Sequence, residues 1–352
     1  MTDRTTPILA TDGELITIAV TRGDLVESRH RVMAVVADAQ GRIVAHWGDA
    51  ATPVYARSTV KPFQALPLVL SGAMEAFGLD DRHLALASAS HTGESLHVDL
   101  VAEWLGRIGL DPTDLECGAT DPADPETARA VIRAGGGPRP DYNNCSGKHT
   151  GFLTLARHRR VSHKGYIDYD HPVQAEVRSA MSVLLDRSLV GAAWGIDGCG
   201  IPTYVLPLGD LARGFARFAD PAGLSHDMRT AAGMVMSAMT AHPELVGGQG
   251  RFDSEGMACQ PGALMIKSGA EGMCAASVPG RGLGIVTKVV DGAHRASDVA
   301  MGAVLRHLGL LDDADWERLQ PYCQPVVHNV VGREVGIIQA CGHSARGDDR
   351  IE

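Results

Sequence analysis

The segment at residues 143–151, Asn-Asn-Cys-Ser-Gly-Lys-His-Thr-Gly, places a thiol, a hydroxyl, an amine and an imidazole within five consecutive residues. If a helix opens near residue 147, the free amide groups at its start favour bound anions and lower the pKa of a nearby thiol. Lys148 follows Cys145 by three residues, a spacing that can bring both heads to one point. The alternative is a polar loop that caps a helix. A phosphate-binding loop is excluded, because Tyr142 stands where its first glycine is required and His149 follows the lysine.

A second candidate pair, Ser58 and Lys61, places a hydroxyl and an amine one helical turn apart on the same face. A serine hydroxyl needs a base to become a nucleophile, and an amine with a lowered pKa can serve. A free lysine titrates near ~10.4, so Lys61 must be partly desolvated or lie near another cation. The alternative is an ordinary helix start, with Ser58 as the N-cap and Lys61 in solvent.

A third candidate, Lys267-Ser268-Gly269, follows the apolar run at residues 263–266, which is typical of a strand. In penicillin-binding proteins and serine β-lactamases, Ser-x-x-Lys is paired with a strand-borne Lys-[Ser/Thr]-Gly that faces the nucleophile. Both patterns are present here in that order. The middle motif of those enzymes, Ser-x-Asn, has no convincing counterpart in this chain.

Ser90 lies in the segment Ser88-Ala-Ser-His-Thr-Gly-Glu94, at the end of an apolar, strand-like run that begins at Leu84. Because a glycine follows shortly after it, Ser90 could present its hydroxyl to a cleft. The alternative is a strand-to-helix cap with Glu94 in the first turn of the helix.

Two cysteines, Cys145 and Cys199, stand in glycine-rich turns far apart in the sequence. Zinc binds thiolates readily, and a tetrahedral site with one open position needs one more protein ligand. Lys148 could be that ligand only as the neutral amine, which the metal itself would enforce, and lysine is a rare zinc ligand. Cys259, eight residues before Lys267, could border the same cleft. The remaining cysteines have no polar cluster nearby and are interpreted as small core or surface residues: Cys117, Cys274, Cys323 and Cys341.

The elements that must position these groups follow from the periodicity. β-branched and alternating stretches predict strands at 15–20, 31–36, 42–47, 263–267, 275–278, 283–290 and 333–340. Helical spacing predicts helices from 58 to 77 and at 94–108, 126–134, 173–185, 207–218, 225–242 and 297–308. The expected fold is therefore α/β, with an antiparallel sheet built from both termini and a helical lobe from the middle of the chain.

These predictions give a single two-lobed domain over residues 1–352. We expect a sheet lobe at about 12–57 and 260–345 and a helical and loop lobe at about 58–259. A site between two lobes suits a small ligand.

The composition narrows the class of protein further. The 352 residues are 45% hydrophobic and 21% charged, as in a soluble globular chain. The net charge of −10, without any Lys/Arg block, argues against nucleic-acid binding. No run approaches a membrane span or a signal sequence, so we expect a cytoplasmic protein with no membrane partner. Seven cysteines, an odd number in a reducing compartment, favour thiols or metal ligands over disulfides.

Taken together, the motifs resemble those of the class 3, rhizobial-type L-asparaginases, also called the asparaginase II family. The resemblance extends from about residue 12 to residue 340. The matching stretches are Ala-Arg-Ser-Thr-Val-Lys-Pro-Phe-Gln at 56–64, Ser-His-Thr-Gly-Glu at 90–94, Asn-Asn-Cys-Ser-Gly-Lys-His at 143–149, Gly-Ile-Asp-Gly-Cys-Gly-Ile-Pro at 195–202 and Lys-Ser-Gly-Ala-Glu-Gly at 267–272.

The resemblance implies a serine-β-lactamase-like fold, usually a homodimer, that hydrolyses L-asparagine to L-aspartate and ammonia. It implies two Ser–Lys pairs, Ser58 with Lys61 and Ser90 with Lys267. It also implies a Zn²⁺ ion on Cys145, Lys148 and Cys199, with Asp197 near the metal and the substrate, and it makes Arg57 and His149 candidate substrate contacts.

Three alternatives remain open at the level of sequence. The attacking serine is not decided, although Ser58 is favoured because its lysine lies one turn away. The substrate could be another amide, such as glutamine or a β-lactam-like compound. In a different class of protein, the cysteine cluster would be the whole function, as a non-catalytic zinc or thiol sensor.

Overall fold

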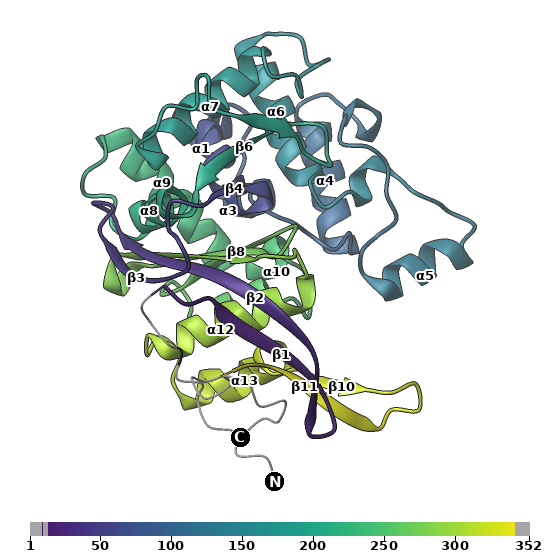
Figure 1. Cartoon of the computed structure of the whole chain (residues 1–352). Helices are drawn as coiled ribbons and strands as arrows, with labels where there is room; N and C mark the ends of the chain where they lie inside the picture. Colours follow the sequence, from purple (N-terminus) through teal and green to yellow (C-terminus); the bar gives the residue numbers. More distant parts are fainter. Residues whose placement is uncertain (1–8, 10–12, 342–352) are drawn as a thin grey trace.

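The computed structural model describes residue 9 and residues 13–341. The predicted sheet-lobe positions 12 and 342–345 lie outside the described residues. An eight-stranded antiparallel sheet crosses the molecule in the order β10-β11-β1-β2-β9-β8-β7, with β3 beside β2 (Figure 1). Its strands are β1 (Ile16–Arg22), β2 (Leu25–Asp38), β3 (Ile43–Trp47), β7 (Met265–Gly269), β8 (Met273–Val278), β9 (Leu283–Val289), β10 (Val326–His328) and β11 (Glu334–Ala340).

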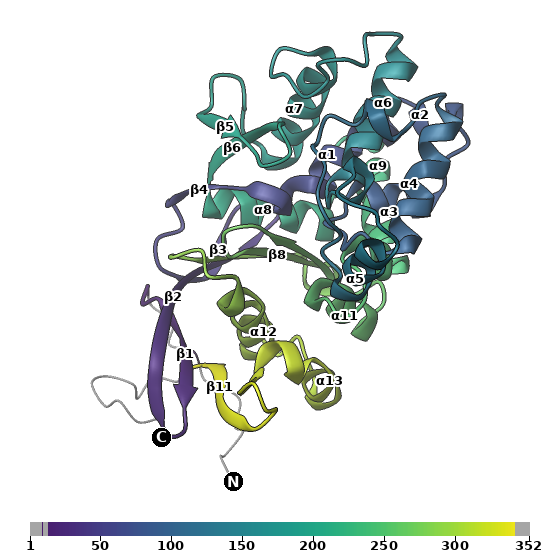
Figure 2. The same cartoon turned by 90° about the vertical axis from the view of Figure 1, so that its right-hand side faces the viewer.

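The two ends of the chain meet in this sheet. β2 pairs with β1 on one side and with β9 on the other, so an N-terminal hairpin is inserted between C-terminal strands. The run at 34–37 in β2 is buried because helices contact the sheet on both faces. Helix α8 (Leu208–Ala219) packs on β2 and β9, and α12 (Ser297–His307) packs on β8 and β9 from the opposite side (Figure 2). The predicted α/β class and the origin of the sheet in both ends of the chain are confirmed.

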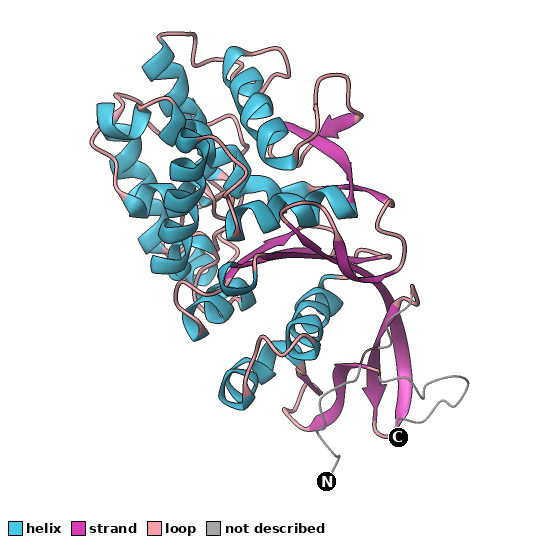
Figure 3. Ribbon diagram, turned by 90° about the vertical axis from the view of Figure 1, so that its left-hand side faces the viewer, coloured by secondary structure: helices cyan, strands magenta, loops and turns pink. Residues whose placement is uncertain are grey.

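The middle of the chain forms helices that gather on one side of the sheet (Figure 3). They are α1 (Lys61–Leu70), α2 (Ala73–Ala76), α3 (Asp81–Ala87), α4 (Ser95–Arg107), α5 (Pro125–Arg133), α6 (Ser146–Arg159), α7 (Pro172–Leu185), α9 (His226–Ala241), α10 (Pro243–Val246) and α11 (Phe252–Cys259). Helix α13 (Asp313–Cys323) packs against α11 and α12 near the C-terminal strands. The two-lobed domain boundaries stay a prediction.

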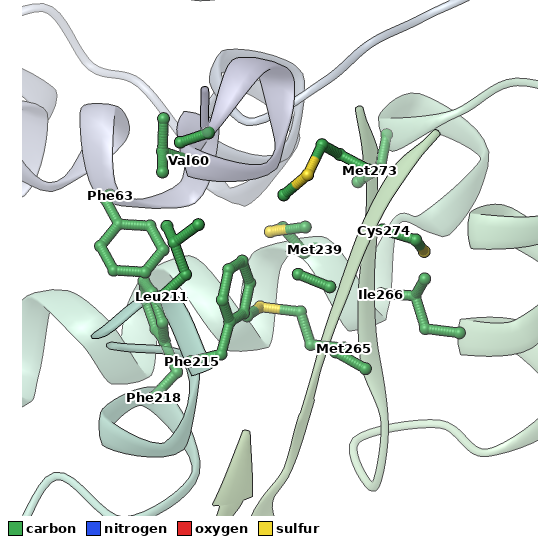
Figure 4. Close-up of a cluster of buried hydrophobic side chains, with 14 of the residues drawn as sticks. Val60, Phe63, Leu211, Phe215, Phe218, Met239, Met265, Ile266, Met273 and Cys274 are labelled. Carbon is green, nitrogen blue, oxygen red and sulfur yellow. The ribbon is translucent and has the colours of Figure 1, made fainter. Parts of the chain in front are cut away.

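An aromatic and sulfur-rich core joins the helices to the sheet (Figure 4). Phe63 of α1 makes edge-to-face contacts with Phe215 and Phe218 of α8, with ring centroids 5.1 Å apart in each pair. Met265 and Ile266 of β7 are fully buried in the same cluster. This packing fixes the start of α1 against the strand that carries Lys267.

Two predicted elements are wrong. The run from Leu84 to Ser90 is not a strand: its first residues belong to α3, which begins at a capping box in which Asp80 accepts from the amides of Arg82 and His83. The helix predicted from 58 to 77 is divided into the 3₁₀ turn η1 (Arg57–Val60), α1 and α2. It breaks before α2 at Gly72, whose φ of 79° lies in the left-handed region.

A small second sheet was not predicted. It has the order β4-β6-β5, from strands β4 (Pro53–Tyr55), β5 (Trp194–Ile196) and β6 (Pro202–Pro207). Each strand is too short to show a clear alternation. Within the described part of the chain, no helix is both long enough and apolar enough to cross a membrane.

Candidate active site

The hydroxyl of Ser90 lies between two buried amines. Lys61 Nζ and Lys267 Nζ are each 2.9 Å from Ser90 Oγ. Lys61 is the first residue of α1, Lys267 is the middle residue of β7, and Ser90 follows α3. The two lysines are 1% and 0% exposed, so neither amine is solvated as a surface lysine would be. The structure thus brings together three of the four predicted Ser–Lys residues by hydrogen bonds.

Lys61 has a full set of neighbours. Its amine donates to the carbonyl oxygens of Ala89 at 2.6 Å and Asn144 at 3.3 Å, in addition to Ser90. Burial is the largest influence and lowers the pKa of Lys61. The Lys148 ammonium lowers that pKa further, and the two nearby cysteines oppose it. A neutral amine has two N–H groups and one lone pair, so Lys61 can donate to both carbonyls and still accept a proton.

Lys267 is the second amine at Ser90, and its pKa is also lowered. Burial lowers the pKa of Lys267 to about 7, with Asp253 opposing that effect and Lys61 and Arg251 adding to it. Its amine donates to the Ser268 carbonyl oxygen at 2.8 Å as well as to Ser90. At neutral pH the two amines therefore share less than two full positive charges.

Ser58 is the second residue of η1, three positions before Lys61. Residues i and i+3 eclipse one another in a 3₁₀ turn, so the side chains of Ser58 and Lys61 lie on the same face. The Ser58 side chain is half-buried, and no hydrogen bond to its hydroxyl is found among the described residues. Gly269 lets β7 approach this turn, since a Cβ there would lie 3.1 Å from the Thr59 methyl group. The Ser58 hydroxyl is thus free to meet a ligand on the face of the turn that carries Lys61.

Arg57 and Asp197, two predicted substrate contacts, form an ion pair beside Ser58. Arg57 Nε donates to Asp197 Oδ1 at 2.8 Å. Burial alone would raise the pKa of Asp197, but Lys148, the Gly198 amide and Arg57 hold it below the ordinary value. The φ of Arg57 is 49°, a left-handed conformation that costs a non-glycine residue free energy. A strained residue beside a reactive group is a frequent mark of a functional site.

Cys145, Lys148 and Cys199, the predicted zinc ligands, also converge. Cys145 is the N-cap of α6, and Lys148 Nζ lies 3.1 Å from Cys199 Sγ. The Cys145 thiol donates to Asn144 Oδ1 at 3.0 Å. The neighbouring Cys145 side chain, with Lys148, lowers the pKa of Cys199 to about 5 against the effect of burial. The Cys199 side chain and burial raise the pKa of Cys145 to about 12. Gly147 is needed here, because a Cβ would collide with the Leu86 carbonyl oxygen of α3.

This donor set, two thiols and one amine with Lys148 Nζ 3.1 Å from Cys199 Sγ, suits a zinc ion with one open position. Within the described residues, no three histidine, cysteine, aspartate or glutamate side chains are grouped to hold a metal ion. A metal at this place therefore depends on Lys148. Burial would lower the pKa of Lys148, but the two sulfurs and Asp197 hold it above its ordinary value, so the metal must displace a proton.

Two further residues singled out from the sequence are His149 and Cys259. His149 is fully buried; its Nδ1 is 2.7 Å from the Tyr166 hydroxyl, and its Nε2 has no partner among the described residues. Cys259 is the last residue of α11, where burial raises the pKa of its thiol and Arg318 of α13 opposes that effect. Its place at the border of the site stays a prediction.

Two residues near the site were missed or misread from the sequence. Cys117 is not remote from polar groups, because Cys145 and Cys199 are close enough to help burial raise its pKa to about 12. Asp253 of α11 is fully buried, with its Oδ2 3.9 Å from Lys267 Nζ. No local pattern marks Asp253, since α11 itself was not predicted.

A serine held by two desolvated lysines, in an α/β fold with an antiparallel sheet, defines a candidate serine hydrolase. Residues 18–340 match the family described as L-asparaginase II, and the chain belongs to this family. A search of the curated proteins finds no match.

Among solved structures, the chain is similar to a β-lactamase from Mycobacterium bovis, with 15% identity over 80% of this chain and 95% of the other and a TM-score of 0.43. It is also similar to an octameric penicillin-binding protein homologue from Pyrococcus abyssi, with 14% identity over 83% and 75% of the two chains and a TM-score of 0.41. Likeness at this level carries no argument about activity.

Proposed function

We propose that the protein hydrolyses the side-chain amide of L-asparagine to L-aspartate and ammonia, with Ser58 as the nucleophile. The observation that carries the proposal is the bridge of Ser90 Oγ between Lys61 Nζ and Lys267 Nζ, 2.9 Å from each. A hydroxyl between two amines can pass a proton in either direction, next to a second hydroxyl that is free to attack. Membership of the L-asparaginase II family supports the choice of an amide substrate.

Ser58 is preferred over Ser90 as the attacking residue for two reasons. The Ser90 hydroxyl is already held by both amines, and its backbone N–H donates to the Val246 carbonyl oxygen at 2.9 Å, so that amide cannot stabilise an oxyanion. Ser58 lies at the start of a 3₁₀ turn, where the first backbone N–H groups have no partner within the turn. Such amides can hold a developing negative charge.

In the first half of the reaction, Ser58 Oγ forms a bond to the amide carbon while neutral Lys61 takes the hydroxyl proton. The carbon–nitrogen bond then breaks. The departing nitrogen takes a proton from Ser90, whose oxygen is reprotonated by the Lys61 ammonium, and ammonia leaves. The aspartyl group is now an ester of Ser58.

In the second half, Lys61 takes a proton from a water molecule, whose oxygen attacks the ester carbon. The Ser58 alkoxide leaves and recovers that proton from Lys61, so aspartate is released and both lysines return to their starting state. Lys267 keeps the Ser90 oxygen oriented throughout and exchanges protons with Lys61 through it.

A zwitterionic amino acid needs one cationic and one anionic contact. We assign the α-carboxylate of the substrate to Arg57 and its α-ammonium to Asp197, which already form an ion pair beside Ser58. The amide of asparagine lies one methylene closer to these groups than that of glutamine. A pocket that distinguishes two substrates by one methylene group favours one of them by about 10- to 200-fold in kcat/KM.

Zn²⁺ is proposed on Cys145, Lys148 and Cys199, because Lys148 Nζ lies 3.1 Å from Cys199 Sγ and Cys145 influences the same thiol. Three protein ligands leave one position of a tetrahedral ion open. When bound, the ion supplies positive charge that can orient an oxygen atom of the substrate. The serines and lysines carry out the proton transfers without it. A homodimer and a cytoplasmic location remain expectations from the resemblance and the composition.

The test is ammonia release by the purified full chain from asparagine, glutamine and a chromogenic β-lactam. We expect ammonia release from asparagine and no opening of the β-lactam. The kcat/KM for glutamine should be at least about 10-fold lower than that for asparagine. If the protein acted only on glutamine or only on the β-lactam, that compound and not asparagine would be the substrate. Tight zinc binding without turnover of any amide would favour the zinc or thiol sensor instead.

A further inference from the structure

Close to Lys267 lies a buried carboxylate, Asp253, to which the proposed reaction assigns no role. Asp253 of α11 is 1% exposed, and its Oδ2 is 3.9 Å from Lys267 Nζ. The same oxygen accepts from the Ser268 hydroxyl at 2.7 Å and from the Ser268 amide at 3.4 Å. Two neighbouring residues of β7 are therefore held by one carboxylate oxygen.

The other oxygen of Asp253 is unsatisfied. Among the described residues, Asp253 Oδ1 is buried and has no hydrogen-bond partner. Burying a carboxylate with half of its acceptors unused is costly, and a residue that only joined α11 to β7 could be neutral. The property of Asp253 that affects its neighbours is therefore its negative charge.

Asp253 is in its ionised form. Burial would raise the pKa of Asp253, but Lys267, Arg251 and the Ser268 hydroxyl hold it below the ordinary value. A neighbouring carboxyl responds to that charge: burial and then Asp253 raise the pKa of Asp298, in the first turn of α12, to about 7. Of two nearby acids, Asp253 keeps the negative charge and Asp298 takes the proton more readily.

We propose that Asp253 is a positioning residue that sets the charge of Lys267 and thereby the proton content of the Lys61–Ser90–Lys267 chain. The inference rests on the proposed function, because it assigns a role in that reaction. At 3.9 Å, the carboxylate is too far for a hydrogen bond and close enough for a strong charge interaction. It stabilises the Lys267 ammonium whenever a proton moves toward it through Ser90.

The groups that face Lys267 define the expected pH behaviour. They are Asp253 from α11, Arg251 just before it, Lys61 from α1 and Cys274 from β8. Asp253 and Cys274 favour the charged amine, while Lys61, Arg251 and burial oppose it. Removing the negative charge of Asp253 must therefore lower the pKa of Lys267. An opposite charge at this range is worth about 1 to 3 pH units.

The experiment compares wild type, Asp253→Asn and Asp253→Glu by two readouts. The first is the acid limb of kcat/KM for asparagine, expected near pH 7 in wild type. In Asp253→Asn we expect it at least about one unit lower, and in Asp253→Glu near the wild-type position. The second is the pH dependence of the reaction of Lys267 with an amine-acylating reagent, followed by mass spectrometry, which requires no turnover.

Asp298→Asn is the matched control, because it makes the same chemical change in a neighbouring acid that does not act directly on Lys267. It should leave the labelling pKa of Lys267 unchanged, which also separates the titration of Asp298 from that of the lysine. If Asp253→Asn does not fold, Ser268→Ala still tests the proposal. This substitution removes the Ser268 hydroxyl that donates to Asp253, so the negative charge of Asp253 acts more strongly on Lys267. The labelling pKa of Lys267 should therefore rise.

The two readouts separate the possible failures. A wild-type protein that releases no ammonia removes the proposed function, while the labelling data still test Asp253. An Asp253→Asn protein with lower stability but an unchanged Lys267 labelling pKa would overturn the inference and leave Asp253 as a staple between α11 and β7. An unchanged pKa in Ser268→Ala would also count against it.

Discussion

Lys61 and Lys267 direct their amines at one oxygen atom, with each Nζ 2.9 Å from Ser90 Oγ, although one lysine opens a helix and the other lies in an edge strand. Within the described part of the chain, neither amine is hydrogen-bonded to a carboxylate, and both amines are buried. Two ammonium groups at this separation repel each other, so at least one amine loses its proton near neutral pH. Among the described residues, the Ser90 hydroxyl is thus hydrogen-bonded by two lysine amines and by no histidine.

The identity of the nucleophile gives the first prediction. Ser58→Ala should lower kcat by at least about 10⁴-fold, because the acyl-enzyme cannot form, whereas Ser90→Ala should cost about 10²- to 10⁴-fold through the lost proton transfer. A diazoketone analogue of asparagine should label Ser58 in wild type and in Ser90→Ala. Mass spectrometry of the labelled peptide measures this directly.

Ser88→Ala is the control for these serine variants. Its hydroxyl is buried two residues before Ser90 and donates only to the Leu84 carbonyl oxygen, so it should change stability but not the site of labelling. A label on Ser90, with Ser58→Ala still active, would reverse the assignment of the two serines.

The second prediction concerns pH. The pKa of Lys267 is about 7, and protons exchange with Lys61 through Ser90, so a neutral amine is present above that pH and lost below it. We expect kcat/KM to fall about tenfold for each pH unit below 7 and to level off above it. Lys267→Met should cripple turnover at every pH while the circular dichroism spectrum stays native. A profile that rises toward acid would contradict the lysine base.

The sequence predicted much of this site because its residues lie in short motifs. Ser58 with Lys61, and Cys145 with Lys148, are each three residues apart, and local geometry alone brings such pairs together. The pairing of Ser90 with Lys267 came from the family resemblance. The hydrogen bond from Lys61 to Ser90 was not predicted, because it depends on how α1, α3 and β7 pack.

Neither the role of Asp253 nor the small sheet could be predicted from the sequence. Asp253 acts through Lys267, which is fourteen positions later and on a different element, so no periodicity connects them. The stretch at 84–90 was predicted as a strand because its small apolar residues suit either element, and the capping box at Asp80 decided in favour of a helix. The longer strands of the main sheet were predicted, whereas its three-residue strand β10 was missed because it is too short to show a pattern.

The third prediction concerns zinc. The purified protein should contain about one zinc ion per chain, and Cys145→Ala and Cys199→Ala should each weaken binding at least about 100-fold, because each removes a sulfur donor. Cys259→Ala should keep the metal, since that thiol lies beside α13. Elemental analysis after dialysis against a chelator checks all four proteins. Zinc retained by both ligand variants would place the metal elsewhere.

The last prediction uses the ion pair between Arg57 and Asp197. If these side chains receive the two charged groups of the amino acid, Arg57→Ala and Asp197→Asn should each raise KM for asparagine at least about 10-fold and affect kcat less. Asp38→Asn is the control, because it breaks a comparable pair with Arg42 in the hairpin between β2 and β3 and should leave KM unchanged.

Arg57→Gly adds a stability test of the same residue. The φ of 49° at this position suits glycine, so Arg57→Gly should be more stable than Arg57→Ala by about 1 kcal/mol, although both lose the guanidinium. Denaturant unfolding measures the difference, and steady-state kinetics should give the two variants the same raised KM. Equal stabilities would mean that the backbone at Arg57 relaxes without cost, and an unchanged KM would remove Arg57 from substrate binding.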